Sequence, residues 1–224
     1  MKRFYVITPY FKQIFCLILL CFICIFCACE KKVNYFDYVS ELRENIFIAE
    51  REDYFLKMHS TVKETPRSLD GIKRDSVTLT EVFLTAPSGE ETYTLTFHVD
   101  NKKYGGEMSY NNVRGEYYFS CTLDTTKLSQ IVCELSYNET TFQLTAKSVR
   151  SKEVLSASSV LEKLAQTEKN LFQALTDKYG FQGEICIRLI YEDAPYYYVG
   201  VTDKKEKTTA YLLNAISGQI LAKK

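Results

Sequence analysis

An alternation of apolar and polar residues runs through much of the chain and restricts the folds available to it. In residues 93–99 every second side chain is apolar and each one between is polar. A similar period of two recurs in residues 54–62, 117–123, 131–137 and 142–146, which are rich in Thr, Tyr and other strand-favouring types. Short strands with one apolar face predict an antiparallel β-sandwich or a strongly curved antiparallel sheet over residues 45–148.

The edges of this β domain are less regular. Apolar residues at helical spacing in Tyr35–Arg43 predict a short helix there, and Ile46–Ala49 is expected to pair with the strand that follows Asp53. Val77 and Leu79 are apolar on one phase, whereas Val82 and Leu84 are apolar on the other. This change of phase predicts a bulge near Thr80–Glu81.

The last part of the chain combines a helical pattern with further strands. Polar residues 147–158 mark a boundary, and Ser159 and Glu162 form a Ser-x-x-Glu capping box ahead of an apolar helical stripe that Gly180 ends. Alternation then predicts strands at 185–191, 196–202, 209–213 and 220–222. We expect residues 152–224 to form a small domain with a helix on an antiparallel sheet, able to fold alone but only marginally.

The sequence Tyr211-Leu212-Leu213-Asn214-Ala215-Ile216-Ser217-Gly218-Gln219-Ile220-Leu221 resembles the closing hairpin of PepSY-type modules. In physical terms the motif is a turn, set by Asn214 and Gly218, between two strands. Asn214 stands where Asp is commoner. The resemblance covers about the last 30 residues and implies a secreted or membrane-linked module of a kind proposed to restrain peptidases.

The N-terminus carries the pattern of a secretory signal segment. Lys2, Arg3 and Lys12 precede seventeen uncharged residues, 13–29. Phe26-Cys27-Ala28-Cys29 resembles the bacterial lipobox, in which the final cysteine receives the lipid, although Phe26 replaces the usual Leu and Cys27 the usual Ala or Ser. The resemblance implies cleavage after residue 28, lipidation of Cys29, and residues 29–44 as a tether with a short helix.

Two alternatives to lipidation stay open. The uncharged run reaches the lower limit of about 17 residues for crossing a bilayer, so it could be an uncleaved transmembrane anchor. The chain could also remain in the cytoplasm. We expect a membrane protein held by lipid on the extracytoplasmic side.

Charge and composition limit the partners that the chain could have. Residues 29–224 carry 25 basic and 28 acidic side chains, a net charge of −3. A nucleic-acid partner would call for a basic patch, so none is expected.

The body contains three cysteines, Cys121, Cys133 and Cys186. Their odd number and the absence of CxxC spacing argue against a zinc site. Cys121 and Cys133 fall on the apolar phase of two strands that the sequence places in one hairpin. They could form a disulfide in an oxidising compartment, or remain two buried thiols.

The sequence offers no pattern of catalytic residues. His59 and His98 fall on the polar phases of their strands, which predicts solvated side chains. There is no GxSxG nucleophile motif and no phosphate-binding loop. We therefore expect a protein that is not an enzyme and has neither a cofactor nor a metal.

Tyrosine is the one residue type in clear excess. Tyr196, Tyr197 and Tyr198 put aromatic rings on both faces of one strand, so the outward rings could contact a partner, although tyrosine is also common in strands. We expect a cell-envelope lipoprotein that acts as a non-catalytic protein-interaction module. The alternatives are a solute- or glycan-binding lipoprotein, an envelope hydrolase, or a spacer in an envelope complex.

Overall fold

The computed structural model describes residues 33–66 and 74–224. Residues Asn34–Lys224 form one compact unit, which is mainly β with a nearly closed antiparallel sheet. The predicted signal segment and Cys29, the predicted lipidation site, lie outside the described residues. No helix within the described ranges is long and apolar enough to cross a membrane.

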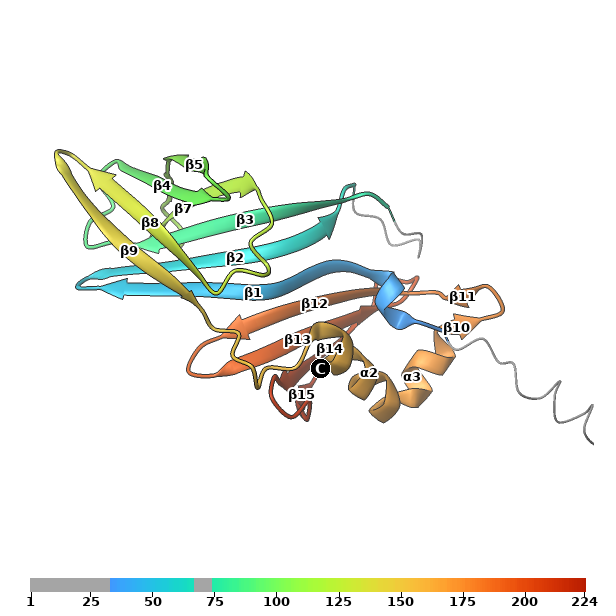
Figure 1. The fold of residues 1–224 in the computed structure, drawn as a ribbon. Coiled ribbons are helices and arrows are strands. Elements are labelled where there is room, and N and C mark those ends of the chain that lie inside the picture. The colour runs from blue at the N-terminus through green and yellow to red at the C-terminus, as the bar shows by residue number, and fades with distance from the viewer. Residues whose placement is uncertain (1–32, 67–73) are drawn as a thin grey trace, which may run out of the picture. The chain divides into compact units, whose positions relative to one another are not determined.

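The first part of the unit consists of nine strands (Figure 1). They are β1 (Val39–Arg51), β2 (Tyr54–Glu64), β3 (Ser76–Thr85), β4 (Tyr93–Val99), β5 (Lys102–Glu107), β6 (Ser109–Asn111), β7 (Glu116–Thr122), β8 (Gln130–Tyr137) and β9 (Thr140–Ser148).

The second part contains the helices. After the 3₁₀ helix η1 (Tyr35–Tyr38) at its N-terminal end, it comprises α2 (Ala157–Thr167), α3 (Lys169–Ala174), β10 (Thr176–Asp177), β11 (Gly180–Phe181), β12 (Glu184–Tyr191), β13 (Pro195–Thr202), β14 (Thr208–Asn214) and β15 (Ile220–Lys223).

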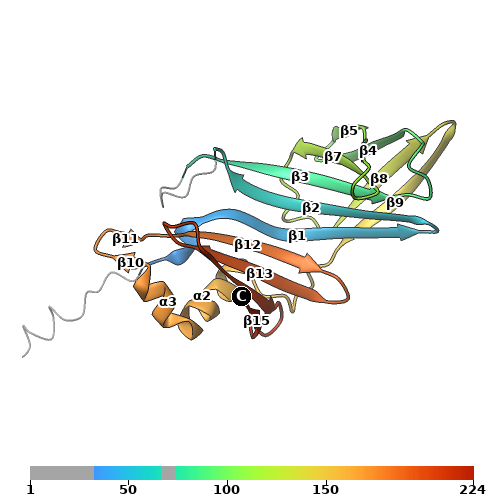
Figure 2. The same cartoon turned by 180° about the vertical axis from the view of Figure 1, so that it is seen from behind.

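One long sheet connects the two parts. Its order is β15-β14-β13-β12-β1-β2-β3-β7-β6, and β9, β8, β4 and β5 branch from β1. The branch starts where Phe47 and Ile48 of β1 pair with Ser148 and Lys147 of β9. The branch strands lie across β1, β2, β3 and β7 as a second layer (Figures 1 and 2). The coarser prediction, a mainly β fold built on an antiparallel sheet, is confirmed.

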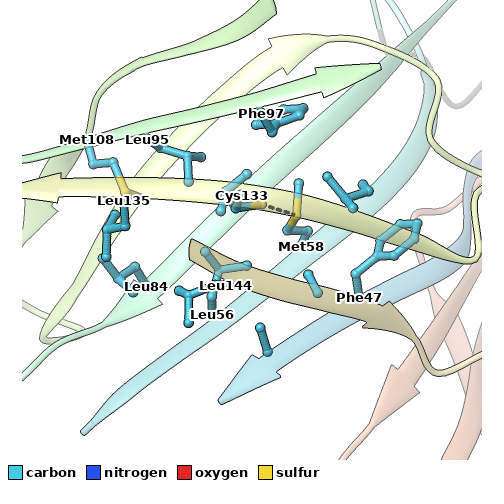
Figure 3. Close-up of a cluster of buried hydrophobic side chains, with 14 of the residues drawn as sticks. Phe47, Leu56, Met58, Leu84, Leu95, Phe97, Met108, Cys133, Leu135 and Leu144 are labelled. Atoms are coloured by element: carbon cyan, nitrogen blue, oxygen red, sulfur yellow. Dashed lines mark hydrogen bonds between the residues drawn. The ribbon is translucent and has the colours of Figure 1, made fainter. Parts of the chain in front are cut away.

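The apolar side chains of the alternating strands fill the space between these layers. Leu56 and Met58 of β2, Leu95 of β4 and Cys133 of β8 are fully buried in one cluster (Figure 3). Burying such side chains contributes about 1.5–3 kcal/mol each. This cluster is the main source of stability for the first part.

Polar side chains replace apolar ones at one end of this core. Thr80 donates a hydrogen bond to the Leu123 carbonyl at 2.9 Å, and Asn45 donates to the carbonyls of Thr126 and Leu128 at 3.1 Å each. The loop after β7 therefore satisfies the buried polar groups, as burial demands.

In the second part, helices instead of strands cover the sheet. Ile187 of β12, Val199 of β13 and Tyr211 of β14 are directly opposite one another on neighbouring strands and are buried. The helices α2 and α3 lie against this part of the sheet (Figure 1). Tyr35 of η1 packs its ring 4.7 Å from Phe172 of α3. The N-terminal end of the described chain thus completes the C-terminal core.

Strand β1 belongs to both parts. Its first half pairs with β12 in parallel, the only parallel pair in the part of the chain described here, and with β2 in antiparallel fashion. The predicted helix over Tyr35–Arg43 is correct only for a single 3₁₀ turn, because from Val39 the chain extends between two strands that supply hydrogen-bond partners. Backbone pairing on both sides outweighs the weak helical pattern.

The long helix predicted after Ser159 also differs in detail. Ser156, not Ser159, caps α2, accepting a hydrogen bond from the Ser159 amide at 3.2 Å. The helix ends at Thr167 and the second short helix, α3, ends at Ala174. Gly180 lies in the short strand β11, so the prediction that it ends the helix is wrong. The four strands predicted after it are confirmed to within a residue or two at their ends.

Candidate functional site

One face of the long sheet packs against the second layer and the helices. Charged residues gather on its other face, which we call the outer face. Strand register pairs Arg43 of β1 with Thr61 of β2 on one side and with Arg188 of β12 on the other. Arg188 in turn pairs with Tyr198 of β13. Residues that are directly opposite on neighbouring strands share a face. We call this set, with Glu41 and His59, the outer-face cluster.

A bulge in β1 creates this arrangement. The pairing of β1 with β2 shifts between Arg43 and Asn45. Residues two apart normally point to the same side of a strand, but here Asn45 bonds into the core loop while Arg43 lies on the outer face. An extra residue in a strand re-aims the side chains beyond it, and such bulges are common beside functional sites.

Arg188 forms the strongest contact of the cluster. Its Nε and Nη2 donate to the two carboxylate oxygens of Glu41, each at 2.6 Å. Burial raises the pKa of the Glu41 carboxyl, but the hydrogen bonds and charge of Arg188, helped by Arg43, hold this pKa below its ordinary value. The same hydrogen bonds raise the pKa of Arg188. The pair is a bidentate ion pair with a fixed geometry.

Arg43 lacks an equivalent partner. Its Nε–H is buried and donates no hydrogen bond to any residue in the described ranges. Burial and the neighbouring charge of Arg188 lower the pKa of Arg43. Two guanidinium groups on adjacent strands repel each other, and only one has a bidentate carboxylate.

His59 and Thr61 continue the cluster along β2. Burial lowers the pKa of His59 to about 3, with the charges of Arg43 and Lys57 adding to the effect, so its imidazole is neutral near pH 7. The His59 Nδ1 and the Thr61 hydroxyl are buried without a hydrogen-bond partner among residues 33–66 and 74–224. The prediction of a solvated His59 is therefore wrong, although its strand phase is right. His98, by contrast, is exposed as predicted.

Tyr198 forms the aromatic part of the cluster. The guanidinium carbon of Arg188 lies 5.8 Å from the centre of its ring. A side chain added at Gly200 would meet the Tyr198 hydroxyl at 3.1 Å and ring carbon Cε1 at 3.3 Å, so the ring lies along the sheet over Gly200. The missing side chain at Gly200 thus determines how Tyr198 lies.

A pocket of about 430 Å³ opens on the same side of β1 and β2, next to the cluster. Lys57, which lowers the pKa of His59, is one of its lining residues. The pocket is lined by two lysines and two glutamates, together with the largely apolar side chains of Ile48, Phe55, Val149 and Tyr191.

The three predicted contact tyrosines separate between the two faces. Tyr197 is fully buried beneath the helices, and its hydroxyl donates to the Leu155 carbonyl at 3.0 Å; burial raises its pKa to about 12. Tyr196 and Tyr198 are half-buried on the outer face. Only these two are placed to contact another molecule.

The two cysteines considered for a disulfide are free thiols in the structure. Cys121 lies on β7, which pairs with β3 and β6, whereas Cys133 lies on β8, which pairs with β4 and β9. The two strands are not arms of one hairpin, which corrects the expectation on which the bridge was based. The Cys133 Sγ packs 3.7 Å from the Met58 Sδ in the core (Figure 3).

The described residues contain no group of three or more His, Cys, Asp or Glu side chains placed to hold a metal ion.

Sequence reasoning missed most of the outer-face cluster. The local pattern places Glu41 and Arg43 in a predicted helix, and the alternation in residues 185–191 indicates no special role for Arg188. An arginine at the centre of Ile185-Cys186-Ile187-Arg188-Leu189-Ile190 is itself a signal, since charged residues are depleted from buried strands unless they are paired. Its partner could not be found without the pairing of β1 and β12.

No protein-family model, no curated protein and no solved structure matched the chain. The PepSY resemblance therefore remains a prediction. The turn on which it is based does form: Asn214 Oδ1 accepts hydrogen bonds from the amides of Ile216 and Ser217 at 2.9 Å each, and Gly218 has a φ of 75°.

Proposed function

We propose that this chain is a lipid-anchored, non-catalytic interaction module on the extracytoplasmic side of a bacterial membrane. It recognises a protein partner through the outer face of its sheet. The observation that supports this role is the placement of Tyr196 and Tyr198 on the outer face, with Tyr198 beside Arg188 and Tyr197 buried on the opposite face. Tyrosine and arginine are the residue types that most often dominate protein interfaces.

The anchor in this proposal is Cys29, at the end of the apolar segment. Cells grown with a labelled fatty acid should incorporate the label into the wild-type chain. The Cys29→Ser variant should stay unlabelled and unprocessed, held in the membrane by its apolar segment. An intact mass in which wild-type protein from membranes retains Met1 and carries no acyl chain would favour the uncleaved anchor instead.

The C-terminal part, α2 to β15, is proposed to be a PepSY-like module. Support comes from the order of helix and strands and from the turn at Asn214 and Gly218. In this proposal its outer face, formed by β12, β13 and β14, carries the contact to the partner.

A photo-crosslinking experiment tests the partner contact. The full chain is expressed in the bacterium that naturally produces it, with a benzophenone amino acid at position 196. Crosslinked adducts are then analysed by mass. We expect one adduct of defined mass, which Tyr198→Ala should largely abolish because it removes the ring beside Arg188. Gly200→Val should act in the same direction, since it displaces that ring.

The matched control places the same probe at position 132, an exposed site on strand β8 of the second layer. Melting temperatures of all variants are measured in parallel, so that lost adducts are not caused by unfolding. Adducts of equal yield at positions 132 and 196, or an adduct unaffected by both outer-face variants, would contradict a specific contact.

A solute- or glycan-binding role is the second candidate. The pocket of about 430 Å³ beside the cluster favours it, because that volume suits a small ligand and the lining combines polar and apolar groups. The chain has no Trp, which weakens a role in stacking against sugar rings.

A further inference from the structure

The outer-face cluster has more hydrogen-bond donors than acceptors. Each oxygen of Glu41 accepts a hydrogen bond from Arg188. Glu81, the other carboxylate whose charge acts on Arg43, accepts a hydrogen bond from the Tyr118 hydroxyl at 3.3 Å. The Arg43 Nε is left buried without an acceptor from the described residues. A buried cation of this kind is costly unless something else completes its shell.

Two more buried polar atoms without a partner belong to residues on the same face of the neighbouring strand β2. Thr61 pairs directly with Arg43 across the strands, is 2% exposed, and has no hydrogen-bond partner for its hydroxyl in the ranges described. His59 lies two residues along the same face of β2, and its Nδ1 is equally without a partner there. A guanidinium, a hydroxyl and a neutral imidazole on adjacent strands are all groups that can donate to one oxygen-bearing ligand.

The electrostatics of the cluster favour a negative ligand. Arg43, Arg188 and Lys57 act on this region, and the charges of Arg43 and Lys57 disfavour a proton on His59. An anion placed between Arg43 and Thr61 would reduce the repulsion between the two guanidinium groups. Because guanidinium groups bind carboxylates and phosphates in a planar, bidentate manner, an oxyanion fits better than a halide.

We propose that the outer-face cluster is an oxyanion-binding site that takes a carboxylate or phosphate group. Arg43 Nε provides the charged hydrogen bond, and the Thr61 hydroxyl and the His59 Nδ1–H, in that neutral tautomer, complete the shell. The Glu41–Arg188 pair holds the far side of the site in place. This inference does not depend on a protein partner: the group can belong to a free solute or to an acidic residue of the partner.

Calorimetric titration of the purified full chain in detergent tests the site. Inorganic phosphate and acetate serve as probes at constant ionic strength, with chloride as the balancing salt. We expect saturable binding of at least one of the two. Arg43→Gln and Thr61→Val should each weaken it, Arg43→Gln by roughly tenfold or more, the loss of one charge-assisted hydrogen bond.

The control variant is Lys103→Gln, which removes an exposed cation from the other layer and should leave binding unchanged. All variants must melt cooperatively. If Arg43→Gln fails to fold, Thr61→Val still tests the site, because valine keeps the shape of the side chain and removes only the hydroxyl. No saturable binding by folded wild-type protein, or equal affinities for Arg43→Gln, Thr61→Val and Lys103→Gln, would overturn the proposal.

A second arm identifies the source of the group. In the crosslinking experiment at position 196, saturating phosphate should suppress the adduct if the oxyanion belongs to the partner, and leave it unchanged if the site takes a free solute. The titration uses no partner, so a failure of the oxyanion site and a failure of the partner contact give separate results.

Discussion

At the scale of single residues, His59 is the side chain whose environment departs most from its sequence pattern. Its polar phase predicted contact with water, yet Arg43 of β1, Lys57 of β2 and Glu81 of β3 surround it. Strand phase can be determined from one strand, whereas burial depends on neighbours far away in the sequence. The Arg188–Glu41 ion pair likewise joins residues that are 147 positions apart in the sequence, so neither residue's local pattern predicts it.

The depressed pKa of His59 makes stability depend on pH. The folded protein holds this pKa at about 3, against 6.5 for an unperturbed histidine. Between pH 3 and 6.5 the unfolded chain binds a proton at His59 that the folded protein does not bind. The contribution of His59 to the free energy of unfolding is therefore fully present above pH 6.5 and is lost as the pH falls. From pH 6.5 to 5 the free energy of unfolding should drop by about 2 kcal/mol from this group alone.

Urea unfolding of the wild type, His59→Gln and His98→Gln at these two pH values measures the effect. The drop should be much smaller in His59→Gln than in the wild type. His98→Gln changes the only other histidine, an exposed one, and should retain the full drop. A wild-type-like drop in His59→Gln would show that the imidazole is protonated without cost in the folded protein.

At the scale of elements, the alternating strands were the most predictable part. Strands β4, β8 and β12 to β15 lie close to their predicted bounds because their pattern is strong and uninterrupted. The predicted bulge in β3 is absent: its pairing with β2 is continuous from Ser76 to Thr85. The phase change arises because Thr80 points into the core end, where the Leu123 carbonyl accepts its hydrogen bond.

A bulge does form in β1 between Arg43 and Asn45, directly after the stretch in which the sequence pattern predicts a helix. Similarly, Ser156 rather than Ser159 caps α2, since several serines there can serve as caps and only the approach of the chain selects one. These details could not be predicted because local patterns alone do not determine them.

At the scale of the whole molecule, the sequence predicted two domains, 45–148 and 152–224, and the structure places both in one continuous sheet. The connection after β9 is exposed at Ser151–Glu153, as the composition suggested. What composition could not reveal is that the first residues of β1, which precede the predicted first domain, pair with β12 of the second part. Non-local pairing of parallel strands leaves no local pattern.

The shared strand leads to a prediction about folding. The sequence predicted that residues 152–224 fold alone, but this fragment lacks β1 beside β12 and lacks Tyr35 and Tyr38, whose rings pack against Phe181 at 5.4 Å each. We now expect the isolated fragment to unfold without cooperativity, because one edge of its sheet and part of its aromatic core are missing. Fusing residues 34–51 to it through a flexible linker should restore a cooperative transition.

The comparison requires three proteins: the fragment 152–224, the same fragment fused to residues 34–51, and a control fused to residues 54–64. The control adds β2, which is also a long amphipathic strand but pairs with β1 and β3 instead of β12. Thermal unfolding followed by circular dichroism should show a sigmoidal transition only for the fusion with residues 34–51. If the bare fragment melts cooperatively at the temperature of that fusion, β1 is not needed and the second part is an independent domain.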